Sequence, residues 1–395
     1  MLSLALSLLF IFQSQPAAAE SRPAPPVELK PFGDDNVAQP RLAAVPTPAS
    51  KIKRVEQSPP DKLHIVGQEG FDVVYTNTDD GGKSFVKKVI LLKVKSGAAM
   101  RRGPRIAAFG KNIVVTASEG GDVTERRILS VCSDDAGVTW SQPTTVTDQA
   151  GAAAEGFHDT TVTSNGVFIV TWLDGRTGSG QSIYCSRSLD SGKTWTKNVK
   201  VYESPDGSVC ECCPVSIAAG PKKTVAIAFR NKLNGARDLY VTSSMNDGES
   251  FNKPERIVGE SWNLKACPMA EAAVCYWDEI GDLKNNPIFI NNRDGELTFV
   301  LALRWAKLGR GRRPSIQFVD GLTYISFINE DQKLCLFYSN GNGLRMETID
   351  APDMMNADCP NIGVDENWNP WVVYQSKIGD KAVTRLLRMR SPFNK

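Results

Sequence analysis

The chain has 395 residues, of which 41% are apolar and 23% are charged, a composition typical of a globular protein with enough length to bury a core. Its 46 basic and 44 acidic residues give a formal net charge of +2, which argues against binding to nucleic acid or to an anionic membrane. We therefore expect one large domain without a nucleic-acid partner.

The N-terminal segment resembles a secretion signal. An apolar core runs from Leu2 to Phe12, and the small residues Ala17, Ala18 and Ala19 precede Glu20, as at a signal cleavage site. The apolar run is too short to span a bilayer. We predict a signal peptide over residues 1–19 and a secreted or periplasmic protein with no membrane span after cleavage, although the usual positive residues at the start are missing. A buried N-terminal strand is the alternative.

A Pro-rich segment over residues 20–60 follows the predicted signal peptide. It shows no apolar periodicity, which is typical of a linker or of a strap that lies over a domain. We predict such a segment here, with the option that it includes the first strand of the domain formed by residues 61–395.

The motif Ser-x-Asp-x-Gly-x-Thr-Trp recurs along this domain. Intact copies begin at Ser133 and Ser188 and looser copies begin at Thr78 and Ser244, so successive copies are 55, 55 and 56 residues apart. A period of this size indicates one supersecondary unit per repeat. Apolar runs on both sides of each Gly/Asp cluster predict a β-hairpin whose Asp accepts backbone N–H bonds and whose Gly adopts a positive φ.

Through this motif, which is the Asp box or BNR repeat, the chain resembles the sialidase (neuraminidase) superfamily. The resemblance covers residues 48–390 and implies an all-β fold, a β-propeller with Asp-box repeats. Asp boxes also occur in propellers that are not glycosidases, so the resemblance implies the fold more strongly than an activity.

A second repeated element predicts the number of blades. Short apolar strands begin near positions 104, 159, 214, 268, 314 and 360, and one further period before position 104 places another unit near Pro48. We predict seven blades, with six as the alternative if the first and last segments share a blade. Each such strand is the innermost of its blade, so the first residues of these strands are expected to share one site at an end of the central channel.

Cysteines are concentrated at these strand starts. Three of the nine occur in Cys210-Glu211-Cys212-Cys213, and Cys267 and Cys359 begin two further repeats, with His158 in another. Thiolate, thioether and imidazole ligands together suit a soft metal, Cu(I) first and Zn(II) second. The predicted metal ligands are Cys210, Cys212, Cys213, Cys267, Met269, Cys359 and His158.

Disulfides are the alternative use of these cysteines, because exported proteins favour them. One option joins Cys213 to Cys267 across neighbouring blades. In that case Cys210 or Cys212 pairs with Cys359 or Cys275.

The sialidase resemblance also implies a set of catalytic residues. Sialidases bind the sialic carboxylate with three arginines, the first in an Arg-Ile-Pro motif, and use a Tyr activated by a Glu together with an Asp. This chain has no Arg-Ile-Pro near its first blade, and Tyr374 matches the late Tyr only weakly. The candidate arginines for an anionic sugar are Arg105, Arg176, Arg230 and Arg313.

The sequence therefore predicts an exported, monomeric β-propeller that binds a soft metal such as copper, for storage, delivery or maturation of another exported protein. A sialidase-like exo-glycoside hydrolase that acts on an anionic sugar is the second hypothesis. The third is a disulfide-stapled scaffold that binds a protein partner. Binding is favoured over enzymatic activity at this stage.

Overall fold

The computed structural model describes residues 27–44, 62–95, 102–257, 260–276, 287–301, 304–319, 322–339, 344–349, 357–365 and 369–389. The predicted signal peptide lies outside these residues. Secondary structure in the described ranges consists of strands and contains no helix, which confirms the all-β fold. Accordingly, this part of the chain has no helix that is long and apolar enough to cross a membrane.

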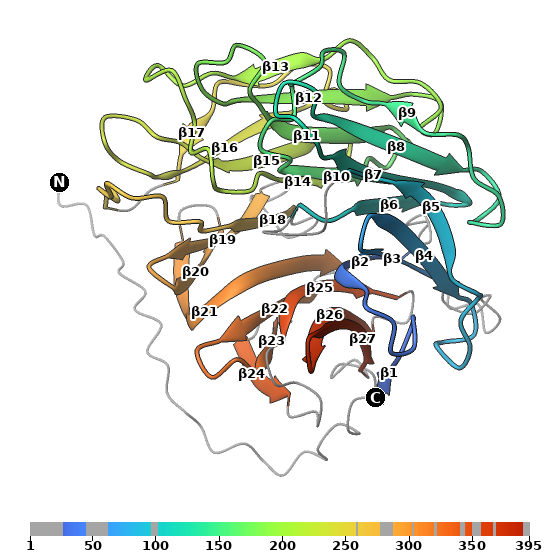
Figure 1. Ribbon diagram of the computed structural model, residues 1–395. Coiled ribbons are helices and arrows are strands. Elements are labelled where there is room, and N and C mark those ends of the chain that lie inside the picture. The colour runs from blue at the N-terminus through green and yellow to red at the C-terminus, as the bar shows by residue number, and fades with distance from the viewer. Residues whose placement is uncertain are drawn as a thin grey trace, which may run out of the picture.

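The strands form six sheets arranged around a common axis, as Figure 1 shows. The first sheet contains β2 (Ala38–Ala44), β3 (Leu63–Glu69), β4 (Asp72–Thr78) and β5 (Val89–Lys93). The second contains β6 (Arg105–Phe109), β7 (Asn112–Glu119), β8 (Arg127–Ser133) and β9 (Thr144–Thr145). The third contains β10 (His158–Val162), β11 (Phe168–Asp174), β12 (Ser182–Ser188) and β13 (Val199–Tyr202).

The fourth sheet contains β14 (Ser216–Ala219), β15 (Val225–Arg230), β16 (Leu239–Ser244) and β17 (Glu255–Arg256). The fifth contains seven strands, β18 (Ala272–Tyr276), β19 (Pro287–Arg293), β20 (Glu296–Leu301), β21 (Arg304–Val319), β22 (Leu322–Asn329), β23 (Leu334–Ser339) and β24 (Leu344–Ile349). The sixth contains β25 (Asp358–Val364), β26 (Pro370–Ile378), β27 (Lys381–Arg388) and the N-terminal β1 (Val27–Leu29).

The described residues form six hydrogen-bonded sheets, so the propeller has six blades. Six was the alternative prediction, and the main prediction of seven blades differs from it. The difference arises from the 16-residue strand β21. Its first part pairs with β20 and its second part pairs with β22, so the seven-stranded sheet comprises two four-stranded repeats that share one strand. The seventh repeat is thus present but is fused to its neighbour.

The two ends of the described chain close the ring. Strand β1 pairs antiparallel with β27, with Glu28 opposite Leu387, so N-terminal residues supply the outermost strand of the last sheet. Figure 1 shows β1 beside the C-terminal sheet. Both β1 and β2 fall within the Pro-rich segment 20–60, so part of that segment belongs to the propeller.

The Asp boxes are turns between the third and fourth strands of their sheets. In the second sheet, the Asp135 carboxylate accepts hydrogen bonds from the Ser133 hydroxyl (2.8 Å) and the Thr139 backbone N–H (2.9 Å). Gly137 has a φ of 87°, and a Cβ there would collide with the Tyr75 hydroxyl of the preceding sheet. Trp140 packs edge-on against the same Tyr75 ring, with 4.8 Å between centroids. Each box therefore also holds neighbouring blades together.

Candidate functional site

The inner strands enclose a cavity of about 440 Å³ along the propeller axis. Its walls come from β2, β6, β10, β14, β18, β21 and β25, which are the first strands of the successive four-stranded repeats. Apolar side chains such as Ile106, Ile217 and Phe318 line part of the cavity. The charged and sulfur-containing side chains of its lining include Arg41, Arg105, Asp159, Glu271, Arg313 and Cys359.

Asp159 and Arg105 form an ion pair in this lining. The Arg105 Nε lies 3.4 Å from the Asp159 Oδ1, and the Arg105 side chain is only 8% exposed. Backbone N–H groups of Thr160 and Ile217 donate to the Asp159 carboxylate, each at 3.0 Å. Burial nevertheless raises the pKa of Asp159, with the Arg105 charge acting in the opposite direction. The arrangement therefore favours a protonated Asp159 over a wider pH range than an exposed aspartate.

Arg105 also lies close to a second cation. Burial lowers the pKa of the Arg105 guanidinium, and the positive charge of Arg41 lowers it further. Arg41 donates a hydrogen bond to the Pro40 carbonyl at 2.8 Å and forms no ion pair within the described ranges. Two neighbouring guanidinium groups and one carboxylate leave a local excess of positive charge that an anion can neutralise.

Arg313 is held by two acidic residues on its side of the cavity. Its side chain binds both carboxylate oxygens of Asp358, with Nε 2.7 Å from Oδ1 and Nη2 3.3 Å from Oδ2. Although burial opposes ionisation, the Arg313 guanidinium lowers the pKa of Asp358. The Arg313 backbone N–H donates to the Glu271 carboxylate, which itself lines the cavity.

The backbone that presents these residues is irregular in the same way in three repeats. The pairing register shifts between Ala38 and Arg41, between Arg312 and Ser315, and between Asp358 and Asn361. Each bulge contains a residue with positive φ directly before a proline, and these are Gln39 (49°), Arg313 (60°) and Cys359 (52°). Bulges redirect side chains and recur beside functional sites, as does backbone held in sparsely populated conformations.

Four of the predicted metal ligands form a second cluster, next to the cavity. Cys212 and Cys267 form a disulfide, which differs from the expected Cys213–Cys267 pairing. The Cys210 Sγ lies 3.3 Å from the Cys213 Sγ and 3.8 Å from the Cys212 Sγ. The loop before β14 thus meets the loop before β18, so the repeat alignment correctly placed these cysteines on neighbouring repeats.

Two arginines flank this cluster and perturb its thiols. Arg237 Nη1 donates to the Cys210 Sγ at 3.1 Å, and the Arg230 guanidinium lies beside Cys213. The hydrogen bond between Cys210 and Cys213 lowers the pKa of Cys210, with the Arg237 charge acting in the same direction. The same hydrogen bond raises the pKa of Cys213. Cys210 is therefore the thiol of the pair that ionises first.

Of the other three predicted ligands, two lie outside this group of sulfurs. Cys359 lines the arginine cavity, where burial raises its pKa. His158 is 1% exposed, with Nδ1 3.4 Å from the Gly156 carbonyl, and burial together with Arg105 lowers its pKa to about 3. Both residues stand at the starts of other inner strands and do not join the sulfur group. Met269 follows Cys267 by two residues in the loop before β18 and is 42% exposed.

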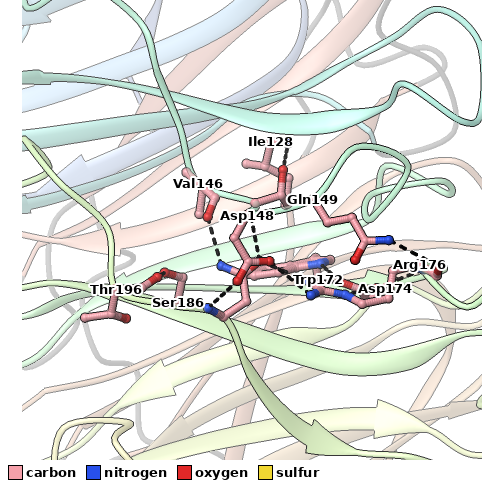
Figure 2. Close-up of polar contacts among 11 residues, drawn as sticks. Ile128, Val146, Asp148, Gln149, Trp172, Asp174, Arg176, Ser186 and Thr196 are labelled. Atoms are coloured by element: carbon pink, nitrogen blue, oxygen red, sulfur yellow. Dashed lines mark hydrogen bonds and ion pairs between the residues drawn. The ribbon is translucent and has the colours of Figure 1, made fainter.

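Two of the four candidate arginines, Arg105 and Arg313, line the cavity, and the other two do not. Figure 2 shows Arg176 bound to Asp174 and Asp148, and Asp174 also accepts the Trp172 indole N–H at 2.7 Å. Arg230 binds the Asn292 carbonyl at 2.9 Å and stacks on the Trp262 ring at 4.8 Å. Neither arginine belongs to the cavity lining.

Tyr374, the weak match to a catalytic tyrosine, is fully buried on β26. Its hydroxyl donates to the Glu28 carboxylate of β1 at 2.8 Å, a pair that joins the N-terminal strand to the last sheet. Tyr374 does not belong to the cavity lining, so it is excluded as the nucleophile of this site.

Sequence reasoning missed Arg41, Asp159 and Glu271 as site residues. Asp159 and Glu271 lie at or just before inner-strand starts that the repeat alignment identifies, next to the histidine and close to the cysteines that were predicted as ligands. Arg41 was missed because the first inner strand was expected near Pro48, whereas β2 covers Ala38–Ala44. The signal was Pro40-Arg41, a proline beside the first inner-strand residue as in the other repeats.

Comparisons with known proteins agree with this architecture. Residues 112–276 match the family model described as the BNR repeat-like domain. The matched residues are a BNR-repeat region of the β-propeller. No curated protein sequence matches this propeller.

Solved structures similar to the propeller include glycosidases. The intramolecular trans-sialidase of Ruminococcus gnavus aligns with a TM-score of 0.53 at 11% identity, over 91% of this chain and 96% of that one. A Trypanosoma rangeli sialidase mutant with trans-sialidase activity aligns with a TM-score of 0.51 at 11% identity, over 93% and 60% of the two chains. The GH93 α-L-arabinofuranosidase of Fusarium graminearum aligns with a TM-score of 0.50 at 14% identity, over 93% and 98%. At such identities the likeness defines the fold alone.

Proposed function

We propose that the propeller binds glycosides of an anionic sugar in its axial cavity and hydrolyses them. The supporting observation is that Arg41, Arg105 and Arg313 line one cavity together with Asp159 and Glu271. A planar carboxylate is best bound by guanidinium groups, and glycoside hydrolysis uses a pair of acidic side chains. Sialidases and an arabinofuranosidase that share the fold are consistent with this chemistry.

Each residue has a distinct role in this proposal. Arg41 and Arg105 bind the sugar carboxylate, since their mutual repulsion is relieved by an anion. Asp159 acts as the general acid, because its raised pKa keeps a proton available for the leaving oxygen. Glu271 is the second carboxylate of the pair. Arg313, which is bound by Asp358, adds a third guanidinium group to the cavity lining.

Arg41→Ala is the cleanest test of anion binding, because Arg41 is half-buried and supports no ion pair within the described ranges. Hydrogen bonds to charged groups contribute about 1.5–3 kcal/mol, so the Kd for an acidic sugar is expected to rise by about 10- to 100-fold. Isothermal titration calorimetry with N-acetylneuraminic acid, glucuronic acid and neutral glucose measures this.

Arg310→Ala is the matched control, because Arg310 is an exposed arginine paired with Glu330. It should leave the Kd unchanged. The proposal is wrong if acidic sugars bind no more tightly than glucose, or if Arg41→Ala and Arg310→Ala have the same effect.

A second candidate function, soft-metal binding, is favoured by the sulfur cluster. The sulfur atoms of Cys210, Cys212 and Cys267 lie within 4.8 Å of one another, and Cys213 is in contact with Cys210. After reduction of the disulfide, these four thiols offer the soft ligands that Cu(I) prefers, with Zn(II) second. Copper binding is therefore proposed only for the reduced protein.

Competition with a chromogenic Cu(I) chelator tests this candidate on anaerobically reduced protein. We expect one tightly held copper per chain, with at least a tenfold loss of affinity in the Cys210→Ser, Cys267→Ser double variant. Cys335→Ser serves as the control, because Cys335 is a buried cysteine on β23 and does not belong to the sulfur cluster. Equal retention by the wild type and the double variant would exclude the copper site.

A further inference from the structure

The four clustered cysteines divide into an exposed pair and a buried pair. Cys267 is exposed and Cys212 is half-buried, and these two form the disulfide. Cys210 and Cys213 are both buried and are both free thiols. A Cys-x-x-Cys dithiol thus lies directly behind a disulfide that faces solvent.

Cys210 contacts both pairs. Its Sγ is 3.3 Å from the Cys213 Sγ within the buried pair and 3.8 Å from the Cys212 Sγ of the disulfide. The Cys267 Sγ lies within 4.8 Å of it as well. No backbone rearrangement is needed to bring a thiol of the buried pair against the exposed disulfide, since the sulfurs are already at contact distance.

Thiol–disulfide exchange proceeds by attack of one sulfur on a disulfide sulfur, and the contact between the sulfurs of Cys210 and Cys212 meets this requirement. Arg237 donates to the Cys210 Sγ, and Arg230 lies beside Cys213. Cys275, by contrast, is buried in an apolar cluster with Ile288 and Ile290. Two guanidinium groups beside one dithiol distinguish this cluster from buried cysteines that serve only packing.

We propose that Cys210, Cys212, Cys213 and Cys267 form an internal thiol–disulfide relay, which moves a disulfide between the exposed pair and the buried pair. The relay is distinct from the sugar site and does not depend on the proposed hydrolysis. In one form the surface carries a disulfide, and in the other it carries two thiols.

The exchange is balanced without any external oxidant or reductant. The Cys210 thiolate attacks the Cys212 sulfur, which breaks the Cys212–Cys267 bond, forms a Cys210–Cys212 bond and releases the Cys267 thiolate. The Cys213 thiolate then attacks the Cys210 sulfur, which forms Cys210–Cys213 and releases the Cys212 thiolate. The protons of the buried thiols pass through solvent to the two released thiolates. One disulfide and two thiols are present before and after.

Alkylation under native conditions tests the relay in the full chain, purified without reductant and carrying one disulfide among these cysteines. Excess N-ethylmaleimide is added, and peptides are mapped unreduced by mass spectrometry after acid quenching. We expect label on Cys212 and Cys267 together with a Cys210–Cys213 disulfide, because alkylation traps the exposed thiols. In Cys210→Ser, labelling of Cys267 should slow at least tenfold.

Two further variants identify the order of steps. Cys213→Ser retains the first exchange, so Cys267 should still be labelled, now with a Cys210–Cys212 disulfide. Cys335→Ser should behave as the wild type. An intact Cys212–Cys267 disulfide after prolonged labelling of the wild type would overturn the relay, even if no variant folds. Equal rates of Cys267 labelling in the wild type and in folded Cys210→Ser would do the same.

Discussion

Replacing Asp159 with Asn is expected to lower kcat for an acidic-sugar glycoside by about 100- to 10,000-fold, the range that general acid catalysis supplies. The amide cannot donate a proton to the leaving oxygen, while Arg41 and Arg105 remain to bind the sugar, so KM should change little. Steady-state kinetics with fluorogenic glycosides of N-acetylneuraminic acid and glucuronic acid measure the effect.

Two further readouts separate proton donation from a structural role of Asp159. A glycoside with an acidic phenol as leaving group needs less protonation, so the loss in Asp159→Asn should be smaller for it than for an alkyl glycoside. The wild-type rate should fall as the pH rises through the pKa of Asp159, because the acid must be protonated and burial raises that pKa. An equal loss with both leaving groups would contradict the assignment.

Arg105→Met is expected to destabilise the propeller by about 3 kcal/mol at pH 7, since it leaves the Asp159 carboxylate without its charged partner in a partly buried position. Methionine replaces most of the apolar volume of the arginine, so loss of packing contributes little. Urea unfolding followed by tryptophan fluorescence gives the change in the free energy of unfolding.

The pH dependence of this loss has a defined sign. The folded-state pKa of Asp159 is raised above its unfolded value, so its contribution favours folding at low pH and is lost as the pH rises through the folded pKa. Removing Arg105 raises that pKa further. The loss of free energy of unfolding in Arg105→Met should therefore be largest near neutral pH. It should shrink below about pH 4, near the pKa of an unfolded aspartate.

A double-mutant cycle provides the control for the ion pair. Asp159→Leu in the Arg105→Met background removes the unpaired carboxylate, so most of the lost stability should return. If the double variant is as unstable as the sum of the two single variants, the ion pair is not the cause of the loss.

The architecture was predictable because the Asp box has a local physical cause. The carboxylate of Asp135 accepts the hydrogen bonds that hold its turn, and only glycine fits at position 137, where the turn contacts Tyr75. Each such turn therefore needs the same residue types, and the motif can be recognised in the sequence. Its period then indicates the blades. The sharing of β21 by two repeats was not predictable, because Gly309, Gly311 and Pro314 indicate a break between repeats, whereas the strand continues through all 16 residues.

The site was only partly predictable for a related reason. Inner-strand starts were expected to share one location, and Arg105 and Arg313 do line the same cavity. Arg41 comes from a strand separated from the rest of its sheet by the connection between residues 44 and 63, so a fixed period cannot locate it. The cysteines were expected to converge on the axis. Cys359 does line the cavity, but Cys210, Cys212 and Cys267 lie in the loops before β14 and β18, outside the cavity lining.

A crystal structure of the protein soaked with the free acidic sugar that binds most tightly tests the central claim most directly. We expect the sugar carboxylate to contact the guanidinium groups of Arg41 and Arg105, with the anomeric oxygen next to Asp159. A sugar bound elsewhere on the propeller, or one whose carboxylate points away from both arginines, would contradict the account.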